Sequence, residues 1–118
     1  MTRAAPVELV DYARVVPYGE ARVTWFVRKG DGWTRAAEWP GATVEARDAG
    51  PGTVWERVVT VELAPGTELL RVESRPRAEA PKDPLSYLDR RTPRARATRR
   101  TRYRVDVGGR VSPLSDSR

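Results

Sequence analysis

Apolar and polar side chains alternate with a period of two along much of this chain, and this alternation constrains the fold most. Successive side chains of a β-strand point to opposite faces, so such alternation predicts a strand with one buried face. The clearest case runs from position 20 to position 28. One face carries Ala21, Val23, Trp25 and Val27, and the other carries Arg22, Thr24, Phe26 and Arg28.

Glycine- and proline-containing turns separate several such segments, at a spacing of about ten residues. Glycine supplies the positive φ that tight hairpin turns need, and proline ends a ladder because it lacks an N–H. Turns are predicted at Lys29–Gly32, Pro40–Gly41, Ala49–Gly52 and Ala64–Thr67. The strands predicted between them span residues 20–28, 33–39, 42–48, 53–63 and 68–74. Residues 7–16 fit a short helix or a strand about equally.

Short strands with regular turns are typical of an all-β domain. We predict a small antiparallel sandwich or a Greek-key, OB-like barrel. Its main β domain spans residues 1–75. Residues 76–93 follow as a long proline-rich connection, because Pro76, Pro81, Pro84 and Pro93 disfavour regular structure. Loops of this length are uncommon inside compact domains and tend to be functional.

The C-terminal part of the chain predicts a basic hairpin over residues 94–114, packing on the same domain or projecting from it. Residues 94–107 alternate again, and Gly108–Gly109 is a two-residue turn signal before a short return strand. Five even-numbered positions of the first strand carry arginine: Arg94, Arg96, Arg100, Arg102 and Arg104. The odd-numbered face is mostly apolar and includes Tyr103, which we expect to pack inward.

Positive charge is concentrated in this C-terminal part. Residues 1–89 carry 12 basic and 14 acidic side chains, whereas residues 90–118 carry 10 basic and 2 acidic ones. Arg90 and Arg91 extend the arginine row into the connection. Arginine outnumbers lysine 20 to 2, and Ile, Asn and Gln are absent. A GC-rich or thermophilic source explains that bias, so the placement of the arginines carries the functional signal.

Phosphate binding needs permanent, forked cations on a surface that follows a polyanion, which arginine supplies. Aromatic rings on a neighbouring strand would add base stacking. Phe26 lies on the polar face of its strand and is the ring we expect to be exposed. Trp33 and Trp39, beside turns, fit the core or the surface equally, whereas Trp25 and Trp55 lie among valines and are expected in the core.

Enzymatic chemistry has little support in this composition. The chain has no histidine and no cysteine, which excludes a Ser-His triad, a thiolate nucleophile and a His- or Cys-ligated metal. Carboxylate pairs such as Glu45 with Asp48 arise by chance among 16 acidic residues. We expect no enzyme, metal or cofactor. An enzyme would have to work with Asp, Glu, Tyr, Ser, Lys or Arg alone.

The favoured function is therefore non-enzymatic binding of DNA or RNA through phosphate contacts. The predicted site comprises Arg90, Arg91, Arg94, Arg96, Arg100, Arg102, Arg104, Phe26 and Trp33. The alternative is a structural or interaction subunit whose basic hairpin docks on an acidic protein surface or on a second copy of the chain. The arginines would have a purely structural role if Glu56 and Glu62, or Glu68 and Glu73, neutralised them, or if they guarded a sheet edge.

No apolar run reaches the length of a membrane span, and the first residues lack the apolar segment of a leader. We therefore expect a cytoplasmic protein without membrane contact.

Overall fold

The computed structural model describes residues 3–17, 19–48, 50–76 and 96–114, and within them the fold is all-β. A single short 3₁₀ turn, η1, interrupts the strands of this part of the chain. The elements are β1 (Ala5–Val16), β2 (Gly19–Lys29), β3 (Gly32–Arg35), η1 (Ala36–Glu38), β4 (Thr43–Arg47), β5 (Thr53–Leu63), β6 (Glu68–Pro76), β7 (Arg96–Val105) and β8 (Val111–Pro113). The prediction of an all-β chain is confirmed.

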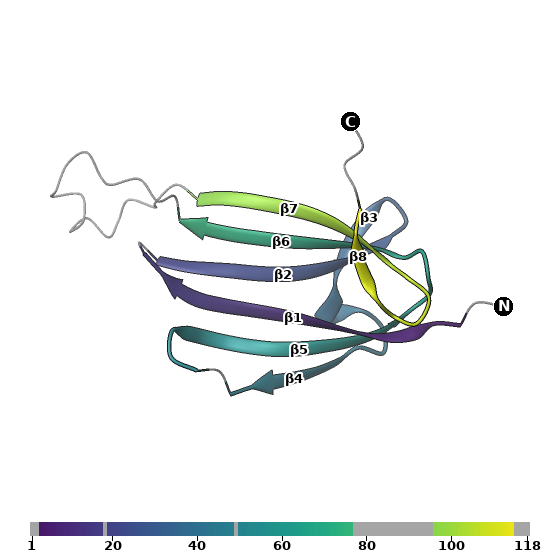
Figure 1. Cartoon of the computed structure of the whole chain (residues 1–118), viewed down its shortest axis with the longest axis horizontal. Helices are drawn as coiled ribbons and strands as arrows, with labels where there is room; N and C mark the ends of the chain where they lie inside the picture. The colour runs from purple at the N-terminus through teal and green to yellow at the C-terminus, as the bar shows by residue number, and fades with distance from the viewer. Residues whose placement is uncertain (1–2, 18, 49, 77–95, 115–118) are drawn as a thin grey trace, which may run out of the picture.

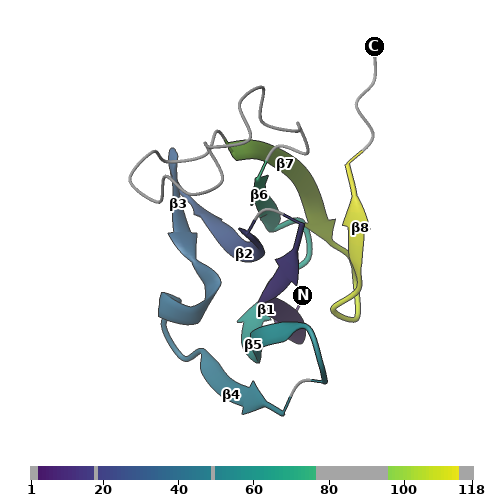
Figure 2. The same ribbon diagram turned by 90° about the vertical axis from the view of Figure 1, so that its left-hand side faces the viewer.

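The eight strands of the described residues form one antiparallel sheet in the order β4-β5-β1-β2-β6-β7-β8, with β3 paired to β2 outside this path. Figure 1 shows β1, β2, β6 and β7 running side by side as long ribbons. The end-on view in Figure 2 shows the sheet curling round into a half-barrel, with β4 and β8 at its two ends.

The structure decides one open segment and corrects one predicted strand. Residues 7–16, left open between helix and strand, form β1, which pairs along its length with β5. The strand predicted at 33–39 is wrong beyond Arg35, because β3 ends there and η1 follows. The Trp39 N–H bonds to the Ala36 carbonyl at 3.1 Å, and Ala36 is fully buried, so packing of a small residue turns the chain before Pro40.

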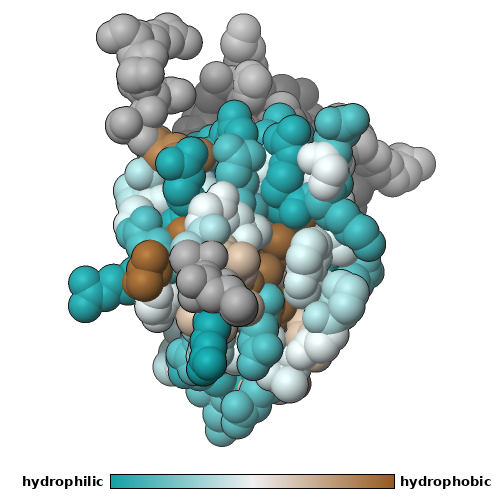
Figure 3. Space-filling view, turned by 90° about the vertical axis from the view of Figure 1, so that its right-hand side faces the viewer, coloured by the Kyte–Doolittle hydropathy of each residue, from teal (hydrophilic) through white to brown (hydrophobic). Residues whose placement is uncertain are grey.

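The main core lies at the end of the sheet where β1 begins. Its fully or nearly fully buried members are Val7, Leu9, Val27, Ala36, Val59, Val61, Leu63, Leu69 and Val105. Trp25, Trp39 and Tyr103 pack against it half-buried. Figure 3 views the molecule from this end and shows apolar surface in the middle, framed by hydrophilic residues. Odd-numbered residues of β2, β6 and β7 thus face the core, as the alternation predicts for β2 and β7.

Asp11 marks the point where β2 changes its neighbour. Residues 19–23 of β2 pair with β1, whereas residues 26–29 pair with β3. Between the two ladders, Oδ1 of Asp11 accepts the Trp25 N–H at 3.0 Å, replacing a main-chain carbonyl. Oδ2 accepts Nε and Nη2 of Arg57, at 3.2 and 3.1 Å. The carboxylate is 1% exposed, and this burial raises the pKa of Asp11 above 3.8, although the two partners act in the opposite direction.

The turn between β7 and β8 closes the core end against β1. Gly108 and Gly109 adopt φ of +91° and +85°, a region that side chains with a Cβ rarely occupy. A Cβ on Gly109 would lie 2.7 Å from the carbonyl oxygen of Pro6, whereas one on Gly108 would meet nothing within 4 Å. Gly109 is therefore required both for its backbone conformation and for close contact with the start of β1.

Candidate nucleic-acid interface

The even-numbered residues of β2, β6 and β7 form the face of the sheet opposite the core, here called the outer face. The β2–β6–β7 register sets these residues in rows. Phe26 lies opposite Leu70, and Leu70 lies opposite Arg102. Thr24, Val72 and Arg100 form the next row. Arg22 and Ser74 follow with Thr98. Strand pairing therefore brings the predicted ring of β2 and the predicted arginines of β7 to one surface, although 74 residues separate Arg28 from Arg102 in the chain.

Arg100, Arg102 and Arg104 are exposed along β7. Alternate residues on a strand are about 6.6 Å apart along its axis, so the three charges extend over about 13 Å. Among the residues that the structure describes, no carboxylate lies within ion-pair distance of Arg100 or Arg104. The Arg102 Nη2 lies 2.9 Å from Oε2 of Glu68. Two of these three cations are thus available to an external anion.

An apolar strip, defined as Phe26 of β2 with Leu70 and Val72 of β6, lies beside the arginines of β7. All three side chains are half-buried. Phe26 is therefore less exposed than predicted, because it packs in the middle of a sheet with strands on both sides. A half-buried ring still presents one edge or face to a ligand, and the neighbouring cations are long enough to reach over it.

Trp33 lies at the margin of the outer face on β3, opposite Arg28 in the β2–β3 ladder. The guanidinium carbon of Arg28 is 5.3 Å from the centroid of the Trp33 ring, within cation–π distance. The half-buried indole thus belongs to the candidate interface and holds one of its cations in place.

The core-facing side of the same strands is polar where β6 runs beyond the core, and it absorbs other charges. Glu73 lies 3.7 Å from Arg71 and 3.9 Å from Arg75, so it neutralises arginines of its own strand. Tyr12 accepts a hydrogen bond from Arg71 at 3.2 Å. Four carboxylates were proposed as partners that neutralise the arginines of β7. Within the described residues, Glu68 is the only one of them that contacts these arginines.

The aromatic residues assigned to the core behave differently from one another. Tyr103 packs inward with its ring centroid 5.0 Å from that of Trp25, as predicted. The prediction for Trp55 is wrong, since this residue is 39% exposed. It lies near the start of β5, opposite Ala13, and the guanidinium carbon of Arg57 is 5.4 Å from the centroid of its ring. The alternation places Trp55 with the core valines, but the members of the main core on β5 are Val59, Val61 and Leu63 alone.

The side chains of four predicted site residues lie outside the description. Arg90, Arg91 and Arg94, with most of the 76–93 connection, lie outside the described residues. Arg96 begins β7, opposite Pro76, but its side chain also lies outside the description.

Sequence reasoning missed the contributions of β2 and β6 to this surface. Arg22 and Arg28 lie on the outer face with the β7 arginines, and Glu68 lies between two of the cations. The alternation of residues 20–28 places the two arginines on the polar face of their strand, which was a usable signal. That β6 separates β2 from β7 follows from strand order, which periodicity does not encode.

No protein-family model, curated protein or solved structure matches this chain. In the part that the structure describes, no helix has the length and apolar character needed to cross a membrane. That part also contains no group of three or more acidic side chains that could hold a metal ion.

Proposed function

We propose that this protein binds nucleic acid without catalysing a reaction, and that the outer face of β2, β6 and β7 is its binding surface. The observation that carries the proposal is the placement of Arg100, Arg102 and Arg104 beside the apolar strip, with Arg22 and Arg28 before and after Phe26 on β2. Cations flanking a strip with an exposed ring edge fit a ligand with a charged backbone and flat bases.

A single strand of DNA or RNA fits this surface better than a duplex. Guanidinium groups bind phosphate oxygens through paired N–H donors, and unpaired bases stack on rings or on arginine planes. Duplex bases are already stacked and offer no face to Phe26 or Trp33. The absence of Asn and Gln removes the usual amide contacts to adenine, so binding is expected to depend weakly on sequence.

The proposal includes the predicted barrel type, the remaining site arginines and the basic hairpin. The half-barrel curl of the sheet supports a Greek-key, OB-like arrangement, in which a sheet face binds the strand. Arg90, Arg91, Arg94 and Arg96 would add phosphate contacts beyond the described surface. The basic hairpin of residues 94–114 would supply the cations that bind phosphate. The protein would bind nucleic acid in the cytoplasm.

A second candidate is docking of the same cations on an acidic protein surface or on a second copy of the chain. The contact of Arg102 with Glu68 favours it, because it shows that a carboxylate fits among these guanidinium groups. The apolar strip is equally open to an aromatic protein side chain. Nucleic acid is preferred because the exposed arginines are spaced along a line, as the phosphates of an extended strand are.

Replacing the two unpaired cations tests the proposal. In the Arg100→Ser, Arg104→Ser variant, the affinity for a labelled single-stranded homopolymer should fall at least about tenfold, because two phosphate contacts are lost. The slope of log affinity against log salt should become shallower by about 1.4. Fluorescence anisotropy over a salt series measures both quantities.

The matched control is the Arg3→Ser, Arg47→Ser variant, which removes the same charge from exposed sites outside β2, β6 and β7. It should bind like the wild type. Equal losses in both variants would reduce the effect to net charge, and no binding by the wild type would refute the proposal. Binding to acidic polypeptides but to no nucleic acid would favour the second candidate.

A further inference from the structure

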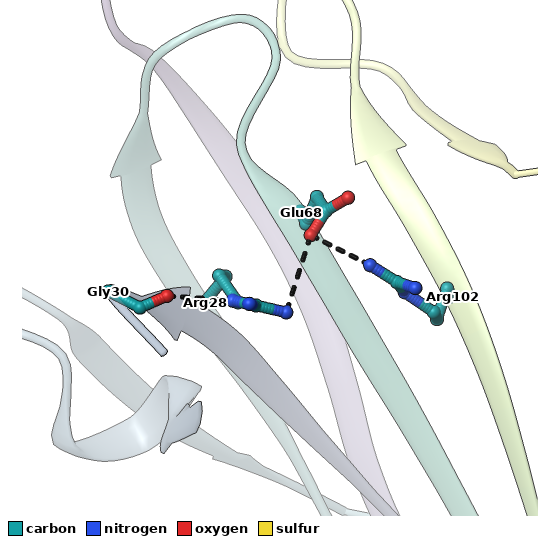
Figure 4. Close-up of polar contacts among 4 residues, drawn as sticks. All are labelled: Arg28, Gly30, Glu68 and Arg102. Atoms are coloured by element: carbon teal, nitrogen blue, oxygen red, sulfur yellow. Dashed lines mark hydrogen bonds and ion pairs between the residues drawn. The ribbon is translucent and has the colours of Figure 1, made fainter. Parts of the chain in front are cut away.

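Two arginines from different strands converge on one carboxylate oxygen of the outer face. Nη2 of Arg102 lies 2.9 Å from Oε2 of Glu68, and Nη1 of Arg28 lies 3.7 Å from the same oxygen. Figure 4 shows the carboxylate between the two guanidinium groups, which approach it from opposite sides. Strand β6 carries Glu68 between β2 and β7, so the sheet itself sets this geometry.

Arg28 is fixed before any ligand arrives. Its Nε donates a hydrogen bond to the Gly30 carbonyl at 2.8 Å, and its guanidinium stacks on Trp33. Arg102 is freer, with 52% of its side chain exposed against 36% for Arg28 and 27% for Glu68. The three charged groups therefore lie at the surface, where a solvent anion reaches the same two cations.

We propose that Arg28 and Arg102 form a subsite for one phosphate group and that Glu68 occupies this subsite in the free protein. The inference rests on the proposed function. It adds the place where one phosphate binds and the residue that weakens this binding. A phosphodiester presents two oxygens with one negative charge, as a carboxylate does, and guanidinium donors bind both in the same forked manner.

Glu68 then weakens binding in two ways. A phosphate entering the subsite must displace the carboxylate from Arg102, and the displaced carboxylate remains on β6 as a like charge close to the phosphate. Both effects vanish if residue 68 is neutral. The subsite should therefore be stronger in a variant without this charge, which is the reverse of the usual loss when an interface residue is replaced.

The test compares Glu68→Gln with Glu62→Gln. Both remove one negative charge, but Glu62 is exposed on β5, opposite Pro6 and away from the outer face. For a single-stranded DNA homopolymer, Glu68→Gln should raise the affinity roughly tenfold above that of Glu62→Gln. Its salt slope should be steeper by about 0.7, because one more phosphate is neutralised. Adding Arg102→Ser to Glu68→Gln should abolish the gain.

The outcomes separate this inference from the proposed function. If the wild type binds and the two glutamine variants bind equally, the subsite is refuted while the function stands. If neither wild type nor Glu68→Gln binds, both fail. A gain that survives Arg102→Ser also refutes the subsite. Thermal melts of each variant establish folding, and Glu68→Ala replaces Glu68→Gln should the latter be unfolded.

Discussion

At the scale of single residues, Asp11 shows how a buried charge can organise a sheet. Its carboxylate joins three strands, since it lies on β1, accepts the Trp25 N–H of β2 and contacts Arg57 of β5. An unpaired amide at a branch of the sheet would cost about 1–3 kcal/mol, which this acceptor avoids. The carboxylate in turn is desolvated, and a buried ion pair gains little net stability.

The raised pKa of Asp11 predicts the direction of a pH effect. The folded protein holds this proton more tightly than the unfolded chain does, so the stabilising contribution is complete below pH 3.8 and is lost as the pH rises through the folded-state pKa. The Asp11→Asn variant keeps the acceptor for Trp25 but does not titrate there. The stability of the wild type relative to this variant should therefore decrease as the pH rises.

Urea denaturation of both proteins from about pH 3 to about pH 7 measures this difference. Arg57 and Arg35 are the charged groups that act on Asp11. A difference that grows with pH would show that these cations outweigh the burial of the carboxylate.

Single residues also show which buried positions the alternation of the sequence predicts and which it does not. Burial of Val23, Val27 and Tyr103 on the core side could be predicted from alternation, because each lies in a strand whose neighbours supply a core. Trp55 obeys the same alternation but is exposed. Periodicity identifies a face of a strand, whereas burial depends on whether another layer covers that face at that position.

At the scale of elements, the β7–β8 turn makes a prediction about stability. Gly108→Ala should cost about 1 kcal/mol, because it strains only the backbone at positive φ. Gly109→Ala should cost about 2–4 kcal/mol, because its Cβ also displaces the Pro6 carbonyl. Chemical denaturation of both variants measures the two losses. Equal losses would mean that the turn does not rest on β1.

Most strands could be predicted from the sequence because glycine and proline mark their ends. The observed bounds of β5 match the predicted segment, and β4 lies within its own. The exceptions have local causes. Residues 7–16 lack strict alternation, since Asp11 is buried with the apolar side chains of β1, and Ala36 ends β3 by packing rather than by any turn motif.

At the scale of the whole molecule, the net charge of +6 is a less useful quantity than its distribution over the sheet. Glu73 neutralises two arginines on the core-facing side, whereas Arg100 and Arg104 of the outer face have no carboxylate partner among the described residues. Predicting this surface from sequence required the strand order β2-β6-β7, which brings distant segments together and has no local signature.

Salt dependence tests this distribution in the wild type. If about five phosphates are neutralised, log affinity should fall with log salt at a slope of about −3.5 for a single strand and about −4.5 for a duplex. The single strand should bind more tightly than the duplex at moderate salt, because only its bases reach Phe26. Titrations of labelled oligonucleotides measure both slopes. A slope near zero would show that the outer face makes no phosphate contacts.

The change of neighbour along β2 restricts what evolution can place at position 11. The side chain there must be short enough to stay inside the fold and must offer an oxygen to the Trp25 amide. Aspartate and asparagine meet both demands, whereas glutamate and glutamine are too long and purely apolar residues offer no oxygen. Natural variants of this chain, however far their surfaces diverge, should therefore preserve an acceptor at that point.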